Sequence, residues 1–310
     1  MTHTSDRKPP FLISIDTEGD DLWSAPTEVT TENARYLPRF QHPCEQHGLK
    51  PTWLTDYEMA ESPVFGEFGR DVLKRGAGEI GMHLHAWNSP PLTAGPRCQA
   101  YLIEYPQRVM REKVAFMTGL LEDRFARKIV SHRAGRWAFN SFYARLLVEH
   151  GYLVDCSVTP HVSWAAHPGD PDGSGGSDYS SYPSQPYFPN LERIDRDGGS
   201  PLLEVPVSIV SLDGAPRWLR PDGENRDYML AILHRARDER WPCVQFVLHS
   251  SELMPGGSPR FQTEDSIESL YDDLEALFAD AEEHFRGATL SGFYDEMLLR
   301  TGRSHPGRPP

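Results

Sequence analysis

The sequence has few cysteines, no excess of basic residues and no long hydrophobic segment. Its four cysteines lack the paired spacing of a zinc or disulfide framework, so we expect free thiols at Cys44, Cys98, Cys156 and Cys243. Lys and Arg number 31 against 45 Asp and Glu, a formal net charge of -14 that argues against partners such as nucleic acid or an anionic membrane surface. No apolar run approaches the roughly 20 residues of a membrane span.

The two ends of the sequence are polar. The first ten residues lack the hydrophobic segment of a secretory signal, so we expect a cytoplasmic protein. Residues 1–9 are expected to be a flexible segment and residues 302–310 a disordered tail. The 310 residues could form one barrel-sized domain or two smaller ones, and we favour one domain over 10–301.

Short apolar runs alternate with helix-length amphipathic segments, the pattern of parallel strands joined by helices in an α/β domain. The expected strands are 11–15, 51–54, 79–84, 128–131, 153–157, 202–207 and 244–248. The expected helices are 31–47, 69–75, 106–122, 141–151, 224–239 and 264–284. Seven strands are enough to close a barrel.

Residues 161–189 form a long segment without periodicity that is rich in Gly, Ser, Pro, Asp and Tyr. A connection of this length is unusual in a compact domain. We therefore expect that it either covers a cleft or is locally mobile.

Two pairs of polar residues stand at the ends of predicted strands. One residue separates His83 from His85, and one residue separates Asp16 from Glu18. Because alternate residues of a strand point to the same side, each pair can converge on one point. Imidazoles and carboxylates are ligands of divalent metals such as Zn²⁺. The alternatives are a structural role for the histidines in the core and a turn at Asp16.

Further ionisable residues follow other predicted strands, namely Arg133, Asp155 and His249. In barrels of parallel strands, the carboxyl ends of the strands surround the active site. A metal there polarises a carbonyl and lowers the pKa of its bound water toward about 7, a carboxylate takes the proton, and an imidazole protonates the leaving group. The pattern therefore indicates hydrolysis of an amide or ester, with His249 as the acid.

In order along the chain, five segments resemble the motifs of the polysaccharide deacetylase family, carbohydrate esterase family four, in a variant form. The resemblance extends from Phe11 to about Leu299. It implies a single distorted (β/α)7 barrel of parallel strands that removes N-acetyl or O-acetyl groups from glycans. In the first motif, Asp16 takes the place of the catalytic base and Glu18 that of a metal ligand.

The second motif resembles the segment from Met82 to Trp87. In the family it usually supplies two metal-binding histidines four residues apart. Here Trp87 stands where the second histidine is expected, and His85 is expected to replace it beside His83. The resemblance thus implies a divalent metal, Zn²⁺, held by Glu18 and these two histidines.

The third motif resembles Arg133-Ala134-Gly135-Arg136-Trp137. By this resemblance Arg133 holds Asp16 and acts in catalysis through it. The backbone N–H near Arg136 faces the oxyanion, and the side chains of Arg136 and Trp137 contact the substrate.

The fourth motif resembles the segment that begins at Asp155, with Trp164 beyond it, and implies that these residues help to wall the acetyl pocket. The fifth resembles Leu248-His249, which carries the protonating histidine. Two alternatives remain open: Asp155 tethers a loop or an arginine, and the aromatic residues serve packing rather than sugar stacking.

The sequence therefore favours a hydrolase that takes an N-acetylated carbohydrate as its substrate and removes the acetyl group with the help of a metal. One alternative is a metal-independent hydrolase of a small cyclic amide on the same fold, which the departure at Trp87 would permit. Another is a non-catalytic carbohydrate-binding relative, although binding alone needs neither a base at Asp16 nor an acid at His249. The sequence does not indicate an oligomeric state.

Overall fold

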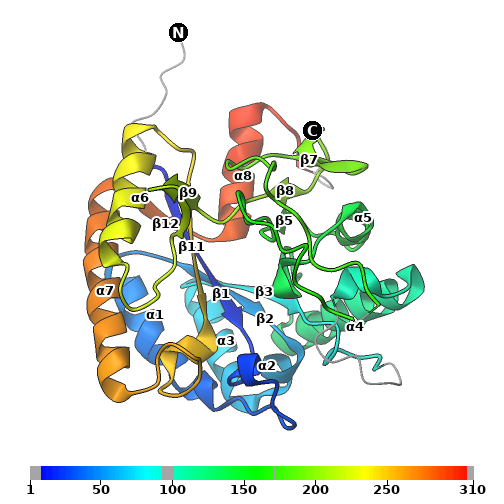
Figure 1. Ribbon diagram of the computed structural model, residues 1–310, viewed down its shortest axis with the longest axis horizontal. Coiled ribbons are helices and arrows are strands. Elements are labelled where there is room, and N and C mark those ends of the chain that lie inside the picture. The colour runs from blue at the N-terminus through cyan, green and yellow to red at the C-terminus, as the bar shows by residue number, and fades with distance from the viewer. Residues whose placement is uncertain (1–7, 93–100, 171, 306–310) are drawn as a thin grey trace.

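A computed structural model describes residues 8–92, 101–170 and 172–305. Its centre is a curled parallel sheet with the strand order β11-β1-β2-β3-β4-β5-β8, and β12 pairs with the start of β1 (Figure 1). These strands are β1 (Pro10–Thr17), β2 (Pro51–Thr55), β3 (Glu79–Leu84), β4 (Ser131–Ala134), β5 (Val154–Asp155), β8 (Leu203–Glu204), β11 (Val244–His249) and β12 (Arg286–Ala288). The expected α/β class and the single distorted (β/α)7 barrel of parallel strands are confirmed.

Helices connect the strands and cover the outside of the sheet. In Figure 1, α6 and α7 lie side by side on one flank, and α4 and α5 lie on the opposite flank. The helices are α1 (Leu37–Gln46), α2 (Tyr57–Glu61), α3 (Pro63–Arg75), α4 (Gln107–Phe125), α5 (Ser141–Glu149), α6 (Arg226–Asp238), α7 (Glu264–His284) and α8 (Leu290–Thr301). Two antiparallel pairs complete the fold, β6 (Pro189–Asn190) with β7 (Arg193–Asp197) and β9 (Ile209–Leu212) with β10 (Ala215–Trp218).

The two faces of the sheet are packed differently. On β1, Phe11, Ile13 and Ile15 belong to the large cluster between sheet and helices, together with residues of α7. Leu12, on the other face, packs in a second cluster with residues of α8. The interior is therefore closed by apolar side chains at the beginning of the strands, and polar residues at their ends can form a site.

The position of β4 differs from the expectation. We placed this strand at 128–131, but it runs over Ser131–Ala134, so Arg133 lies within the strand and not after it. The strand is polar and yet wholly buried at Ser131 and His132, and each of the two side chains has a partner. Ser131 Oγ donates to Glu79 at 2.6 Å, and His132 Nδ1 lies 2.5 Å from Asp155. Burial of paired polar groups is tolerated, so hydrophobicity alone misplaces such a strand.

Most of the two predicted terminal segments, residues 1–7 and 306–310, lies outside the described residues, as does Cys98. The other three cysteines are free and buried. Among the helices of the described ranges, none has the length and hydrophobicity to cross a membrane.

Candidate active site

Asp16 and His249 face each other across two neighbouring strands. In the parallel pair of β1 and β11, Asp16 is the register partner of His249. Nε2 of His249 lies 3.6 Å from Oδ2 of Asp16, which is 2 % exposed. The proposed base and the proposed acid thus meet at the carboxyl end of the sheet.

Arg133 holds Asp16 from the other side of the barrel interior. Its guanidinium is wholly buried and donates from Nη1 to Oδ1 of Asp16 at 2.6 Å, from Nη2 to Oγ of Ser14 at 2.6 Å, and from Nε to the carbonyl oxygen of Cys156 at 3.0 Å. Burial raises the pKa of the Asp16 carboxyl, but Arg133 and the nearby histidines outweigh burial and lower that pKa below its usual range. Asp16 is therefore ionised, and its Oδ1 is held in place.

Glu18, His83 and His85 form a group of buried side chains whose ligand atoms all lie within 4.8 Å of one another. Oε2 of Glu18 is 2.9 Å from Nε2 of His85 and 3.5 Å from Nε2 of His83. Nδ1 of His83 lies 3.0 Å from the carbonyl oxygen of Arg133, which it can reach only as a donor, so in a neutral, metal-binding imidazole Nε2 would be the nitrogen with the lone pair, on the side of Glu18. A backbone partner of this kind commonly orients a metal-binding imidazole.

The pKa of Glu18 reflects its histidine partners. Burial raises the pKa of the carboxyl, but His249, His83 and His85 lower it to below the usual range for a glutamate. An ionised carboxylate and two imidazole nitrogens that converge on one point at the wall of the cleft fit a divalent ion such as Zn²⁺. The three predicted metal ligands are therefore brought together.

His85 takes the place beside His83 that the sequence suggested, and Trp87 packs against it with ring centroids 4.4 Å apart. Nδ1 of His85 is buried without a hydrogen-bond partner. Gly135 lies directly over this ring, because a Cβ atom at Gly135 would stand 2.7 Å from Nδ1 of His85 and 2.5 Å from the carbonyl oxygen of Leu84. The absence of a side chain at Gly135 thus permits the observed position of His85.

His249 is oriented by Glu252, three residues further along the chain. Oε2 of Glu252 accepts from the backbone N–H of His249 at 2.9 Å and lies 3.1 Å from its Nδ1. Nη2 of Arg220 lies 3.1 Å from the same Nδ1 and donates to Oε1 of Glu252 at 2.9 Å. Since Arg220 already has an acceptor in Glu252, we assign the proton to Nδ1 of His249 as a donor to Glu252. Nε2 then faces Asp16.

The pKa of Glu252 fits this assignment. Burial raises it, but Arg220 and His249 lower it to about 2, so Glu252 is an ionised acceptor at neutral pH.

One cleft, of about 330 Å³, is lined by the predicted base, the acid and the three metal ligands, namely Asp16, His249, Glu18, His83 and His85. Three of the four predicted substrate contacts, Arg136, Trp137 and Trp164, also line it. Trp164 comes from the long segment 161–189, so part of this segment borders the cleft. The full lining is Asp16, Glu18, Leu22, Trp23, His83, His85, Trp87, Tyr101, Arg136, Trp137, Trp164, His167, Arg220 and His249.

The turn after β4 has an unusual backbone. Arg136 and Trp137 both have positive φ angles, 52° and 62°, a left-handed conformation that costs roughly 1–3 kcal/mol for a residue with a side chain. Their surroundings hold them there: the guanidinium of Arg136 stacks 4.2 Å from the ring of Tyr101, and the carbonyl oxygen of Trp137 accepts from Tyr179. Strain of this kind is typical of functional sites.

Asp155 does not lie where we predicted. Its side chain is wholly buried and accepts from His132 and from Oγ of Ser157 at 2.9 Å, and it does not line the cleft. The prediction that Asp155 contacts substrate is therefore corrected. It holds His132, whose Nε2 contacts the hydroxyl of Tyr143 at 2.7 Å.

Several cleft residues were not singled out from the sequence. Trp23 lies edge-on to the imidazole of His249, with ring centroids 4.9 Å apart, and comes from the short helix Leu22–Ser24. Tyr101 and Arg220 come from loops, and His167 also borders the cleft. Glu252, which holds His249 from outside the cleft lining, has a sequence signature, since its spacing of three from His249 is that of a capping box.

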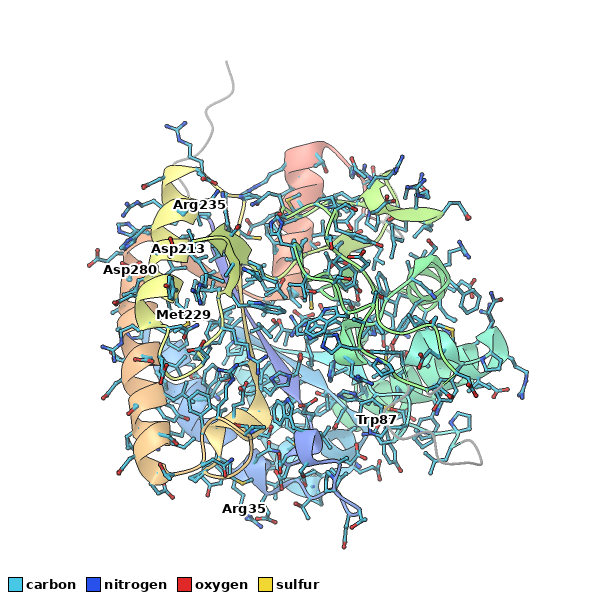
Figure 2. The ribbon with its side chains drawn as sticks, in the orientation of Figure 1. Arg35, Trp87, Asp213, Met229, Arg235 and Asp280 are labelled. Atoms are coloured by element: carbon cyan, nitrogen blue, oxygen red, sulfur yellow. The ribbon has the colours of Figure 1, made fainter. Side chains whose placement is uncertain are left out.

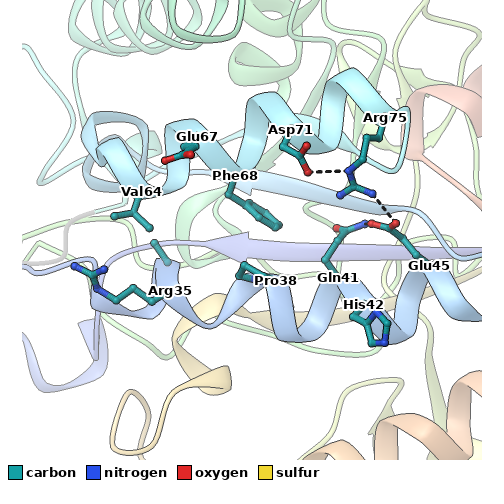
Figure 3. A pocket seen from close by; sticks show the side chains of 11 residues that line it. Arg35, Pro38, Gln41, His42, Glu45, Val64, Glu67, Phe68, Asp71 and Arg75 are labelled. Carbon is teal, nitrogen blue, oxygen red and sulfur yellow. Dashed lines mark hydrogen bonds and ion pairs between the residues drawn. The ribbon is translucent and has the colours of Figure 1, made fainter.

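A larger cavity, of about 570 Å³, lies between α1 and α3 on the outside of the barrel (Figure 3). Arg75 donates there to Asp71 at 2.7 Å and to Glu45 at 2.5 Å, so these charges are paired with one another. Of its lining residues, only His42 is an imidazole, and no metal-ligand group of the described residues faces it. The lining of this cavity therefore lacks, among the described residues, a metal-ligand group like that of the cleft.

No protein-family model and no curated protein matches the sequence. Solved structures match its fold. A Mycobacterium smegmatis protein, assigned provisionally as a polysaccharide deacetylase, matches with a TM-score of 0.61 and 16 % identity over 100 % of this chain and 97 % of that chain. The chain has the polysaccharide deacetylase fold.

Two further structures show how far this fold extends. A Parabacteroides distasonis protein, assigned provisionally as a glycoside hydrolase/deacetylase, has a TM-score of 0.63 and 12 % identity over 97 % of this chain and 73 % of that chain. A 4-alpha-glucanotransferase of Thermococcus litoralis has a TM-score of 0.56 and 13 % identity, and the match spans 94 % of this chain but 40 % of that chain. Because proteins of different activity share the polysaccharide deacetylase fold, the reaction has to be argued from the site.

Proposed function

We propose that this chain is a metal-dependent hydrolase that removes an acetyl group from an N-acetylated or O-acetylated sugar of a glycan or glycan precursor. One observation carries the proposal. A held carboxylate, a buried Glu-His-His group and an oriented imidazole converge in one cleft at the carboxyl ends of β1, β3 and β11. Metal-assisted transfer of an acyl group to water uses these three elements.

Glu18, His83 and His85 would hold the divalent ion, and a bound Zn²⁺ supplies polarisation of the acyl carbonyl and a water of lowered pKa. Asp16 acts as the base. Since Arg133 engages Oδ1 of Asp16, Oδ2 is the oxygen that accepts the proton of the attacking water.

His249 acts as the acid. Glu252 holds Nδ1 of His249, so Nε2 is the nitrogen that gives a proton to the departing amine or alcohol. The backbone N–H near Arg136 stabilises the oxyanion, as the strained turn at this position supports. Trp137 and Trp164 offer aromatic faces to the sugar and limit the access of water.

The test begins with the metal content and acetate release of the purified protein. The proposal predicts one equivalent of zinc or a similar ion, loss of acetate release from N-acetylated sugars after chelation, and recovery on reloading. Asp16→Asn and His249→Gln should each lower the rate about 100-fold or more and still bind zinc, because neither side chain belongs to the metal group.

Each other outcome points elsewhere. Acetate release that persists in metal-free protein contradicts the metal requirement and favours the metal-independent alternative. If zinc-loaded protein binds sugars, and a His249→Ala variant binds them equally well, but no substrate is turned over, the protein is a carbohydrate-binding relative.

A further inference from the structure

A second pocket, of about 170 Å³, opens beside the cleft and is lined by Pro216, Arg217, Trp218, Arg220, Asp222, Asn225 and Arg260. Three of the seven residues are arginines and one is a carboxylate. The whole chain carries a formal net charge of -14, whereas the residues of this pocket carry more positive than negative charges.

Of the three arginines that line this pocket, Arg217 is the one without an ion pair to a described carboxylate. Its guanidinium stacks 4.1 Å from the ring of Tyr228, and Nη2 donates to the hydroxyl of Tyr228 at 3.4 Å. No carboxylate of the described residues forms an ion pair with Arg217, and its Nε atom is buried without a hydrogen-bond partner. A buried donor of a charged group that lacks an acceptor is costly, and an anionic ligand would remove that cost.

The other two arginines are only partly neutralised. The side chain of Arg260 is 54 % exposed, and its Nη1 donates to the backbone carbonyl oxygen of Asp222 at 3.4 Å but lies 3.9 Å from the carboxylate oxygen Oδ2. Arg220 is paired with Glu252, but it borders both the pocket and the cleft. The pocket therefore keeps positive charge that faces its opening.

The start of α6 adds to this charge. Asn225 lines the pocket and precedes the first residue of α6, and the helix has no side-chain cap at this end. Met229 belongs to the first turn of α6 and Arg235 to its last turn. In Figure 2, Met229 is the nearer of the two to the end of the molecule where Trp87 lies. The amino-terminal end of a 13-residue helix, with its partial positive charge, is thus turned toward the cleft side of the molecule.

The pocket adjoins the candidate active site. Arg220, which borders both spaces, contacts the proposed acid His249. Trp218 packs against Trp137 and Trp164 of the cleft, with ring centroids 5.9 Å and 6.4 Å apart. A sugar bound in the cleft would thus place a substituent or a neighbouring residue of the glycan beside the arginines.

We infer that the pocket of Arg217, Arg220 and Arg260 is an anion subsite, which recognises a carboxylate or phosphate group of the substrate next to the acetylated sugar. This inference rests on the proposed function for its place in the reaction, and it names the substrate class as an anionic glycan or glycan precursor. Arginine suits this role because its planar fork pairs with the oxygens of both groups.

Binding tests the subsite independently of turnover. Calorimetric titrations of the full chain would use inorganic phosphate, glucuronate, UDP-N-acetylglucosamine and neutral N-acetylglucosamine. Arg217→Gln should weaken binding of the anionic probes about tenfold or more and leave neutral N-acetylglucosamine unaffected. The control is Arg196→Gln on β7, which removes the same charge from a side chain 56 % exposed and paired with Asp195. It should behave as wild type.

Turnover then tests the place of the subsite in the reaction. We expect kcat/KM for acetate release from UDP-N-acetylglucosamine, or from a disaccharide of N-acetylglucosamine and glucuronate, to fall about tenfold in Arg217→Gln, with the neutral sugar unchanged. Preference for the phosphate or the carboxylate probe identifies the source of the anion.

Two results overturn the inference. One is that the wild type binds none of the anionic probes more tightly than the neutral sugar. The other is that Arg217→Gln and Arg196→Gln bind the anions equally well. Anion binding that depends on Arg217, in a protein that releases no acetate from any probe, would instead overturn the proposed function and leave the subsite in place.

Discussion

Replacement of Gly135 by alanine should disturb the metal group without touching a ligand. A Cβ atom at Gly135 would stand 2.5 Å from the carbonyl oxygen of Leu84 and 2.7 Å from Nδ1 of His85, whereas ordinary contact begins at 3.4 Å. The end of β3 must therefore move by up to about 0.9 Å. Both neighbours resist the movement, since one is backbone and the other is a buried ring packed against Trp87.

This shift exceeds the roughly 0.5 Å within which a functional constellation has to be held. Changes next to a metal ligand typically cost 10- to 100-fold in affinity, and we expect Gly135→Ala to weaken zinc binding by this factor. Titration of metal-free protein against a chromogenic chelator measures the affinity. Thermal unfolding of the same sample separates a displaced His85 from a protein that has lost its fold.

The matched control is Gly119→Ala in α4, where a Cβ atom would meet no atom within 4 Å. Alanine is favoured over glycine inside a helix, so this variant should be stabilised by about 0.5–1 kcal/mol and should bind zinc as wild type does. If folded Gly135→Ala binds zinc within about twofold of wild type, His85 is not a ligand held by this close contact, and the reasoning is refuted.

Three other predictions concern groups around the cleft. His85→Ala should lower zinc affinity about 100-fold or more, while Trp87→Phe should keep it within a fewfold, as measured by the same chelator titration, because His85 belongs to the metal group and Trp87 does not. Burial raises the folded-state pKa of Glu252, but Arg220 and His249 outweigh burial and lower this pKa from 4.5 to about 2. The stabilisation of the folded protein by ionised Glu252 is therefore complete above pH 4.5 and is lost as the pH falls toward 2. Glu252→Gln should cost about 3 kcal/mol in denaturant unfolding at pH 7, and a cost that does not shrink between pH 5 and pH 3 would contradict this account. Glu104 accepts three backbone N–H bonds, two of them from the segment 161–189, so Glu104→Gln should raise KM severalfold with little change in kcat.

Much of the fold could be predicted from the sequence because buried parallel strands consist of short runs of apolar residues. Six of the seven barrel strands lie where this property places them, whereas β4, with its polar residues, is displaced, and α8 and β12 are not predicted. Helix α8 does carry buried residues at helical spacing, namely Leu290, Phe293, Tyr294, Met297 and Leu298, a pattern that the expected helices do not include. The cleft residues from loops, such as Trp23, Tyr101 and His167, have no periodicity, and only the folded chain brings them to the site.

The parity of strand residues explains which predicted site residues reach the cleft and which does not. Glu18 and His85 are each the first residue beyond their strands, which end at Thr17 and Leu84, so alternation still carries their side chains to the interior.

Asp155 differs because its direction depends on the register between two strands. It is the partner of His132 in the β4–β5 pair, so it shares the side of His132, while Arg133 and Cys156 point to the interior. A shift of register by one residue would reverse these faces. The sequence specifies the alternation within each strand but not the register of a two-residue strand against its neighbour. The direction of the Asp155 side chain was therefore the hardest of the site residues to predict. The register of the longer strands β1 and β3 is better determined by their apolar residues, and the site residues at their ends lie in the cleft.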